Sequence, residues 1–568
     1  MKGKRIVRKT LFSTLMTALL LGGIFPALAT AAEAPKPIAT VAFSGYDNLL
    51  KDVAFIGKLS DNPNLLKTVE AIVEAKTQGK GLAGIDKSRS WGLILLPGES
   101  FMPTGYAFIP VTNFDEFIGL LKTSGLDIAD PVDGVVEIVA PNEQRLFVKQ
   151  KGNWAYVCLS KDDFSKVADD PTKLLNDAAK KYNLSVRLFA QNIPAGLKEQ
   201  AIAMMEIVAQ AGMQKLPDEK DVDYAARLEM AKESIKQVRL MLDELDTIFV
   251  GLAVDETTGA AYFDLEETAV PNSSLAKKMQ SIKNGKTQFG GFYQPKAALT
   301  CGTVIDISEF QQNNLQNNLK MYRSLMNLAI DEQELKDEEA AKAKKLVDDI
   351  LAIGEKTIAA GKLDGGSALA IEPGKTTLIA GCRVVDSEAV DKLIQEMAKI
   401  LAAEQPEVAK LLKLDAAEHN GVKFHTISLP VPENNNREKI VELIGEKLDL
   451  VLGVGQNQVY LGAGPLALDK LKAAIDDSKS KVGEEVAPLR MSLAATPICK
   501  FTGDVSENIM VKIMASSLAS VLESSGDDDH ITITVKPLPN GVGCRIELQK
   551  GILKVLGTLP TVGQEPNG

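Results

Sequence analysis

The sequence predicts an α+β protein with two similar tandem domains, each a mainly antiparallel sheet packed with helices, plus helical-hairpin insertions. First, short landmarks recur in the same order in the two halves of the chain. Second, apolar and polar residues alternate in short runs separated by tight turns, which favours antiparallel pairing. Third, longer segments have apolar residues at 4-3 spacing, which is typical of packed helices. A chain of 568 residues is also too long for a single core.

The N-terminal segment has the three-part layout of a secretory signal peptide. Basic residues without acidic ones come first, an apolar stretch follows over 11–25, and small residues such as Ala29 and Ala31 come next. The apolar stretch is short for a membrane span, which needs about 20 residues. We therefore expect residues 1–31 to be a signal peptide cleaved after Ala29 or Ala31. The mature chain is then periplasmic or extracellular, with no integral membrane segment.

An internal duplication explains the recurring landmarks, because chain order is kept while the spacing drifts as loop insertions would make it drift. It predicts one unit over 35–285, a second over 290–558 and a flexible tail over 559–568. A single large sheet is the competing architecture. The matched landmarks are Pro35-Lys36 with Pro295-Lys296, Pro97-Gly98 with Pro373-Gly374, Asp133-Gly134 with Asn420-Gly421, Tyr156 with Tyr460, and Asp246 with Asp529.

Strands and helices can be placed within these units. In the first unit, alternation predicts strands over 91–96, 106–111, 135–139, 154–159, 248–254 and 261–266. Two helices, one around 197–211 and one from Tyr224, are expected to form an antiparallel hairpin joined near Pro217. The second unit has a similar insert, with apolar spacing at Leu315, Leu319, Tyr322 and Met326 and then at Leu346, Ile350 and Ile353. A protein partner could bind through these helical arms.

Composition excludes some functions. The formal net charge is −11, which argues against a nucleic-acid partner because such proteins need a basic surface. The five cysteines are far apart, and no C-x-x-C motif suggests a metal or redox site. Each cysteine lies in an apolar run, which favours buried thiols, although an oxidising compartment would allow one or two disulfides. We predict no cofactor.

Three short motifs suggest chemistry but lack its context. Gly374-Lys375 lacks the earlier glycine and the following helix of a phosphate-binding loop, so a hairpin turn is expected. Gly453-x-Gly455 is followed by a strand and lacks the third glycine of a dinucleotide site. Ser274-x-x-Lys277 lacks the partner motifs of a serine nucleophile, so Ser273 or Ser274 is interpreted as a helix N-cap. No catalytic residue is identified.

The three histidines are the remaining candidates. His419 and His425 flank a predicted turn and could hold a metal across a hairpin with Glu418 or Asp415. The other repeat has Val132 and Ile138 at these positions, which favours exposed hairpin histidines and no metal site. His530 follows three aspartates, 527–529, that lack the spacing of a calcium loop. We interpret them as a solvated loop before a strand.

Three segments carry a resemblance to a known group of proteins. They are Gly81-Leu82-Ala83-Gly84-Ile85-Asp86-Lys87-Ser88-Arg89-Ser90-Trp91-Gly92, FIPVTNFDEFIGLL from Phe108, and GNWAYVCLSKDDF from Gly152. Together they resemble signal-peptide-bearing secreted proteins of planctomycete-type bacteria, most clearly over 35–270. That group has no assigned activity, so the resemblance implies export and supplies no site residue.

The function expected from these observations is a non-catalytic exported envelope protein with a binding or scaffolding role. This expectation rests on two observations. The chain contains two copies of one fold with apolar patterning, and no group of polar residues in the sequence is typical of a catalytic site. One alternative is a secreted hydrolase with a site between the two units, since domain interfaces favour pockets. Another is a carrier of apolar ligands or lipids within a curved sheet.

Overall fold

The computed structural model describes residues 36–98, 103–123, 126–140, 143–212, 214–215, 221–333, 336–433, 437–526 and 528–558. The described chain divides into two compact units. Unit 1 runs to Ala276 and includes the end of the last helix from Leu556, and unit 2 is Lys277–Val555. The predicted signal peptide and C-terminal tail lie outside the described residues. Within the described residues, no helix combines the length and apolarity that a membrane span requires.

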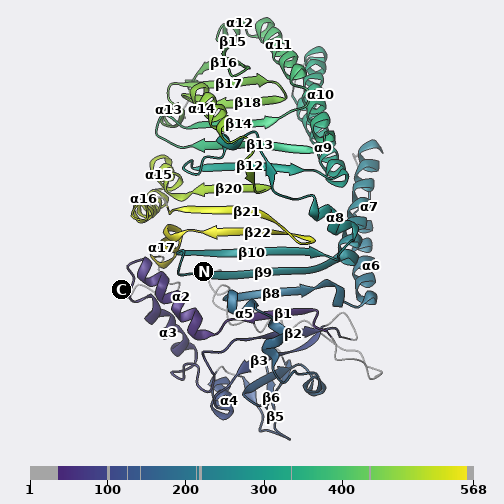
Figure 1. Ribbon diagram of the computed structural model, residues 1–568, viewed down its shortest axis with the longest axis vertical. Coiled ribbons are helices and arrows are strands. Elements are labelled where there is room, and N and C mark those ends of the chain that lie inside the picture. The colour runs from purple at the N-terminus through teal and green to yellow at the C-terminus, as the bar shows by residue number, and fades with distance from the viewer. Residues whose placement is uncertain are drawn as a thin grey trace. The chain divides into compact units, whose positions relative to one another are not determined.

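Unit 1 contains an antiparallel sheet in the order β10-β9-β8-β1-β2-β3-β7-β6-β5-β4 (Figure 1). Strands β1 and β2 pair directly, so that Ala39 lies opposite Leu95. The strands are β1 Ala39–Phe43, β2 Trp91–Leu96, β3 Thr104–Pro110, β4 Asp127–Ile128, β5 Val135–Val139, β6 Arg145–Lys151, β7 Trp154–Cys158, β8 Leu184–Phe189, β9 Leu245–Asp255 and β10 Ala260–Ala269.

Unit 2 contains an antiparallel sheet in the order β22-β21-β20-β12-β13-β14-β18-β17-β16-β15. A separate short pair joins β11 (Gly285–Lys286) to β19 (Glu485–Val486). The strands are β12 Leu299–Asp306, β13 Lys362–Ala370, β14 Thr377–Arg383, β15 Leu412–His419, β16 Val422–Pro430, β17 Lys447–Gly455, β18 Gln458–Ala463, β20 Leu489–Ala494, β21 His530–Leu538 and β22 Gly541–Leu548.

The two strand orders are the same when the strands are matched in chain order. The first strand of each unit, β1 or β12, lies between the second strand of its unit and a strand that comes much later in the chain. The second and third strands add outward, and the next four form a meander that begins at the edge strand, β4 or β15, and returns inward to pair β7 with β3 and β18 with β14. The fold is therefore α+β with two similar tandem domains, as the recurring landmarks predicted.

Helical hairpins occupy the same two connections in each unit. One follows the first strand, and the other precedes the penultimate strand in chain order. In unit 1 these hairpins are α2 Tyr46–Leu59 with α3 Leu65–Lys76, and α6 Ala195–Gly212 with α7 Asp221–Glu244. In unit 2 they are α9 Glu309–Asp331 with α10 Asp337–Ala359, and α15 Ala495–Val505 with α16 Ile509–Glu523.

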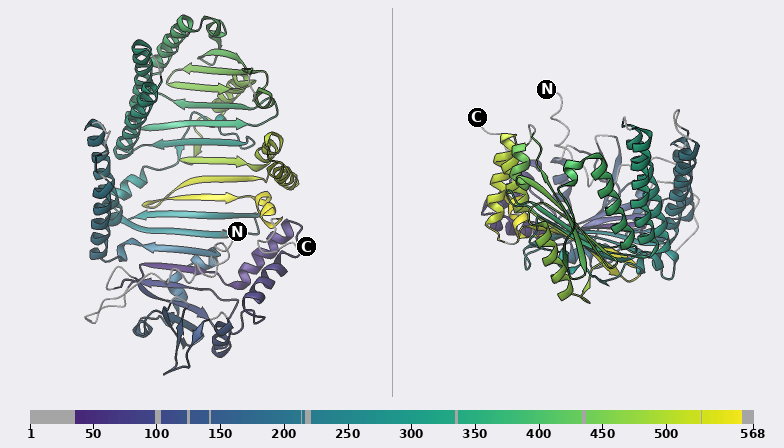
Figure 2. Two further views of the ribbon diagram at one scale, coloured as in Figure 1. Left: turned by 180° about the vertical axis from the view of Figure 1, so that it is seen from behind. Right: turned by 90° about the horizontal axis from the view of Figure 1, so that it is seen from above.

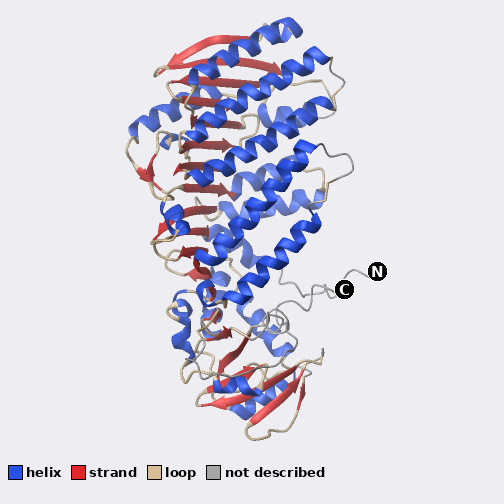
Figure 3. Cartoon of the chain, turned by 90° about the vertical axis from the view of Figure 1, so that its right-hand side faces the viewer, coloured by secondary structure: helices blue, strands red, loops and turns tan. Residues whose placement is uncertain are grey.

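The other helices are short or cover the sheets. They are α4 Phe114–Thr123, α5 Ala178–Lys181, α8 Ser274–Gln280, α11 Ser387–Glu404, α12 Pro406–Ala409, α13 Arg437–Ile444, α14 Ala467–Ser480 and α17 Lys550–Thr558. Single 3₁₀ turns are η2 Lys161–Ser165, η3 Pro171–Leu175, η4 Ala190–Asn192 and η5 Gly290–Phe292. In unit 2, α14 lies on one side of the sheet and α9 and α10 lie on the other (Figure 2). Helices and strands form separate layers within each unit (Figure 3).

Aromatic side chains form the centre of each core. In unit 1, the rings of Tyr106 and Tyr156 meet edge to face with centroids 5.6 Å apart. In unit 2, Phe292 stacks on Tyr460 at 5.7 Å, beneath the buried side chain of Leu471 on α14. A further unit 1 cluster lies under α4 and includes Phe117 and Leu120, together with the strand residues Val136, Ile138, Leu146 and Val148.

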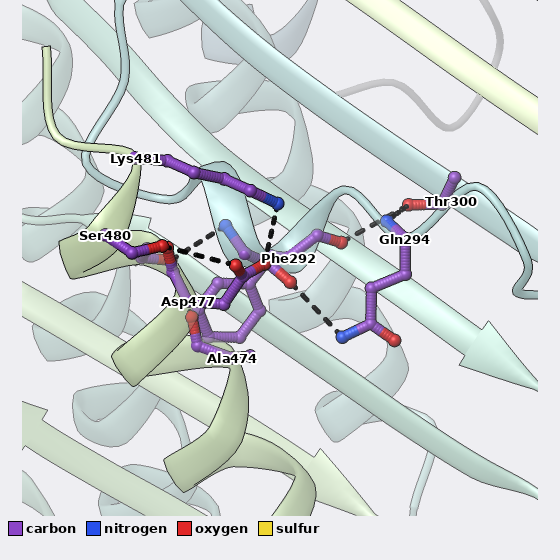
Figure 4. Close-up of polar contacts among 9 residues, drawn as sticks. Phe292, Gln294, Thr300, Ala474, Asp477, Ser480 and Lys481 are labelled. Carbon is purple, nitrogen blue, oxygen red and sulfur yellow. Dashed lines mark hydrogen bonds and ion pairs between the residues drawn. The ribbon is translucent and has the colours of Figure 1, made fainter. Parts of the chain in front are cut away.

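The loop around η5 is fixed to α14 by hydrogen bonds (Figure 4). The backbone N–H of Gly291 donates to Ser478 Oγ at 2.9 Å, and that hydroxyl donates to the carbonyl of Ala474 at 2.7 Å. At the end of the loop, the N–H of Gln294 donates to Thr300 Oγ1 at 2.9 Å. This close approach of loop and helix leaves no space for a side chain at Gly291.

The α9–α10 hairpin differs from its prediction in one respect. The expected apolar contact row leaves Tyr322, Met326 and Ile350 about half exposed. Polar contacts join the helices instead, since the guanidinium of Arg323 contacts Asp348 at 2.9 Å and Glu355 at 3.0 Å. The 4-3 spacing identified the helices, but it did not identify which of their faces pack together.

Candidate functional site

The most unusual buried polar group in unit 2 is His425 on β16. Its neighbour Phe424 points into the core beneath α14, so His425 points to the opposite face of the sheet, where α11 packs. Its side chain is only 4% exposed. A neutral imidazole needs a partner for each ring nitrogen, so its surroundings define what it can do.

Two aspartates surround the ring of His425. The backbone N–H of Asp415 donates to Nδ1 at 3.1 Å, so a neutral ring carries its proton on Nε2. Asp391 Oδ1 on α11 lies 3.5 Å from Nε2, beyond normal hydrogen-bond distance, and Nε2 makes no hydrogen bond with the described atoms. Asp391 is itself held by Gln395, whose amide donates to Oδ2 at 3.0 Å. The ring therefore keeps one buried N–H without a close acceptor.

A pocket of about 360 Å³ adjoins His425, between α11 and β15. Helix α11 contributes small residues one turn apart, Ala398 and Ala402, and β15 contributes Leu414. Charged and polar groups complete the lining, which consists of Gln395, Ala398, Lys399, Ala402, Leu414, Asp415 and His425. The volume is at the lower end of the range for small-molecule sites.

The backbone of β15 explains why space remains at this pocket. The pairing of β15 with β16 shifts register between Lys413 and Ala417, and Asp415 within this bulge has a φ of 50°. A bulge bends its strand and re-aims side chains, so β15 departs from the regular sheet beside α11. No residue pattern over 412–419 indicates this bulge, and the pocket was therefore not predicted.

The proposed alternative of a metal held by His419 and His425 is wrong. His419 lies opposite Val422, and His425 is three positions after Val422 on the same strand, so the two histidines are on opposite faces of the sheet. His419 Nε2 instead lies 2.8 Å from Asp476 Oδ1 of α14. The favoured expectation of two exposed histidines also fails for the buried His425. Among the described residues, no cluster of three or more His, Cys, Asp or Glu side chains could hold a metal.

His530 also differs from its predicted surroundings. It was expected near a solvated loop, but it is buried at the start of β21, as is the adjacent Asp529. Its ring contacts both Asp529 and the carbonyl of Pro295, a residue 235 positions away in the chain. Asp527 of the aspartate run lies outside the described residues. This pair holds structural elements together and adjoins no identified pocket.

The remaining sequence motifs lie in turns and at a helix start. Gly374-Lys375 lies in the turn between the antiparallel strands β13 and β14, and Gly455 ends β17 before its hairpin with β18. Ser273 Oγ accepts the N–H of Ala276 at 3.0 Å, at the start of α8. None of these backbones has the strand-to-helix geometry that a phosphate cradle requires.

The five cysteines are all free thiols. Cys158 is fully buried among aromatic residues of the unit 1 core. Burial and, to a smaller extent, the charge of Asp163 raise its pKa to about 12, and Lys166 opposes this effect only in part. Cys382 is exposed on β14. The disulfides that an oxidising compartment would permit are not formed, and a buried thiol with so high a pKa is a poor nucleophile.

Comparison with known protein families gives one informative match. Residues 307–409 match the family model described as a peptidase dimerisation domain. This range begins just before α9 and ends with α12, so it includes α11 and therefore Asp391 and one wall of the pocket. Comparisons with curated proteins and with solved structures gave no match.

This match corrects the function expected from the sequence. A non-catalytic binding or scaffolding protein was expected because no polar constellation was visible, whereas the matched domain is one of peptidases, which are hydrolases. The expectation failed because a dimerisation domain is recognised through its fold and packing pattern. Such a pattern contains no catalytic motif that could be found by reading residues for chemistry.

Proposed function

We propose that the chain is a peptidase-like hydrolase whose residues 307–409 associate with the same segment of a second copy. The observation that carries this proposal is the match of those residues to a peptidase dimerisation domain. The matched range covers less than a fifth of the chain, so the hydrolase activity and the self-association each need a separate test.

An exposed apolar row on α9 supports self-association. Met321, Leu325 and Leu328 follow one helical face at spacings of four and three residues, with Tyr322 and Met326 beside them. These five side chains are between 41% and 57% exposed. Large exposed apolar groups in one contiguous row are unusual on a monomer, and Met and Tyr are enriched in interfaces. A second copy of α9 would bury this row.

The α9–α10 hairpin can present this row as a firm surface. Ser308 and Gln311 form a reciprocal capping box that defines the start of α9. Arg323 bridges to two acids of α10, and Lys344 of α10 pairs with Asp331 at the end of α9. A partner helix that meets a pre-formed surface loses less conformational entropy on binding than one that must first order it.

Sedimentation equilibrium of the purified mature chain tests the association. We expect a dimer, and we expect Leu325→Glu to weaken it at least 100-fold because a carboxylate would be buried in an apolar contact. The matched control is Val208→Glu, which places the same charge on an exposed apolar position of α6, outside the matched segment. A monomeric wild type, or equal effects of both variants, would overturn this part of the proposal.

Hydrolysis is tested on a mixed peptide library read by mass spectrometry. We expect cleavage products from the wild-type chain, at a rate proportional to enzyme concentration across separate preparations. A mock purification from cells that lack the gene controls for a contaminating peptidase, since contamination would persist without the chain. Peptides that remain intact, with and without added divalent metal ions, would reject the hydrolase assignment.

A further inference from the structure

We propose that the pocket between α11 and β15 binds an apolar α-amino acid in its zwitterionic form. The inference rests on the proposed function, because an apolar amino acid is a product that a peptidase can release. It goes further by naming the ligand and by assigning Lys399 and Asp415 to its two charged ends.

The charges that line the pocket have opposite signs on opposite walls. Lys399 comes from α11, and Asp415 comes from the bulge of β15. No ion pair or hydrogen bond of the Lys399 ammonium with another described residue is found. A ligand carboxylate would meet Lys399 and a ligand ammonium would meet Asp415, as charge complementarity requires. A ligand with a single charge would leave one of these groups unmatched.

The space between those charges is apolar. Ala398 and Ala402 form the floor on the helix side, and Leu414 covers the strand side. Burying an aliphatic ligand side chain here gains about 25 cal/mol for each Å² of apolar surface removed from water. A branched apolar side chain therefore suits the pocket better than glycine, which would contact only the charged ends.

The position equivalent to His425 in unit 1 holds an apolar side chain. The hairpin match places Ile138 of β5 opposite His425 of β16. Ile138 is 2% exposed and belongs to the apolar cluster under α4. Helix α4 ends at Thr123, whereas α11 continues to Glu404, so the last turn of α11 that carries Ala402 has no counterpart on α4. Unit 2 thus has a buried polar residue and a longer helix where unit 1 has a large apolar residue and a shorter helix.

His425 supplies a further sign of a site rather than a packing defect. It lines the pocket, is more than nine-tenths buried, and its Nε2–H has no hydrogen-bond acceptor among the described atoms. A buried donor without an acceptor costs free energy, so its retention in place of an apolar residue requires a compensating role. Nε2 is closed off from solvent beside Asp391, so a shift of Asp391 towards the ring on ligand binding would satisfy it.

Isothermal titration calorimetry of the full mature chain with L-leucine tests the site. We expect saturable binding that weakens at least tenfold with N-acetyl-L-leucine, which lacks the ammonium, and with L-leucinamide, which lacks the carboxylate. Glycine should bind at least tenfold more weakly than leucine. Lys399→Met and Asp415→Asn should each weaken leucine binding about tenfold, and asparagine tolerates the positive φ at position 415.

A matched pair of variants separates the pocket from the rest of the chain. Ala402→Trp should fill the pocket and abolish leucine binding, whereas Ala403→Trp places the same ring on an exposed neighbour that does not line it. The inference is overturned if leucine gives no binding at millimolar concentration, or if Ala402→Trp binds leucine like the wild type. A cavity that holds only water would give the first of these results.

The outcomes also distinguish this inference from the proposed function. Leucine binding that Ala402→Trp abolishes, in a chain that neither dimerises nor cleaves peptides, would uphold the pocket and reject the peptidase-like function. Peptide cleavage and dimerisation without any leucine binding would reject the pocket alone.

Discussion

The imidazole of His530 lies 2.9 Å, at Nδ1, from the carboxylate Oδ1 of Asp529, with both side chains almost completely buried. On its other side, Nε2 lies 2.7 Å from the carbonyl oxygen of Pro295. Both partners are acceptors for the N–H groups of the ring. The second carboxylate oxygen of Asp529 accepts the N–H of Thr496 at 2.8 Å, near the start of α15. These contacts therefore connect β21, α15 and the loop before β12.

Removing one partner of this pair should destabilise unit 2. We expect Asp529→Ala to lower the free energy of unfolding by about 3 kcal/mol, because it leaves a buried imidazole nitrogen and the backbone N–H of Thr496 without their partner. Urea denaturation followed by circular dichroism measures the change. Asp528→Ala is the control, since the neighbouring side chain is exposed. Equal stability of the two variants would mean that the pair contributes nothing.

Unit 1 should lose stability as the pH rises through the pKa of Asp52 on α2. Burial and the nearby charge of Glu256 raise that pKa from 3.8 to about 6. A hydrogen bond from Asn183 opposes this shift, but its effect is smaller. The folded state thus binds this proton more tightly than the unfolded state, so the contribution is complete below about pH 4 and is lost above pH 6.

Asp52→Asn should remove this part of the pH dependence. We expect the variant to gain about 1 kcal/mol relative to wild type between pH 4 and pH 7.5, less than the full linkage value because solvent screens a half-buried group. Urea unfolding at both pH values measures the gain, with the exposed Glu70→Gln on α3 as the control. A wild-type slope that persists in Asp52→Asn would contradict the assignment.

Gly291 should not tolerate a side chain. A Cβ there would lie 2.2 Å from the carbonyl oxygen of Ala474 and 2.7 Å from the backbone nitrogen of Ser478. Since both are helix backbone atoms, Gly291→Ala must push η5 away from α14, and we expect a loss of about 3 kcal/mol. Gly354→Ala on α10 meets only a side-chain carbon at 3.5 Å and should be neutral or slightly stabilising. Thermal unfolding compares the two variants, and similar melting temperatures would show that the loop yields easily.

Cys158 should stay unmodified in the folded protein. Its burial and raised pKa leave almost no thiolate at pH 8. Burial also raises the pKa of Cys382, but that residue is exposed on β14, so we expect iodoacetamide to label it slowly in the native chain and to reach Cys158 only in urea, as peptide mass spectrometry would reveal. Labelling of both residues at similar rates without denaturant would indicate that the core of unit 1 opens readily.

The duplicated fold could be predicted because its signals are local. Turn pairs such as Asn420-Gly421 require positive φ, which both residues adopt, and aromatic positions such as Tyr156 and Tyr460 recur on matching strands. The positions of single side chains depended on contacts between distant segments. The register shift in β15 could not be read from residues 412–419, and it contributed to the pocket beside His425.

Burial of polar residues was the main failure of prediction. His530 follows a run of aspartates, which suggested solvent exposure, yet its partner Pro295 comes from the far end of unit 2 in the sequence. Conversely, Tyr322 and Met326 have the spacing of a packed seam and remain half exposed. Helical spacing fixes which residues share a face, and only the tertiary fold decides what covers that face.

Because the two units have the same strand order, each position in one unit can be compared with its counterpart in the other unit of the same chain. Ile138 and His425 occupy corresponding positions in one topology, so the two units differ by an apolar-for-polar exchange at a buried sheet position. Reciprocal exchange of these two residues would compare apolar packing with a buried polar group inside one molecule. A gene that carries both versions can preserve folding through one copy while the other explores new ligands.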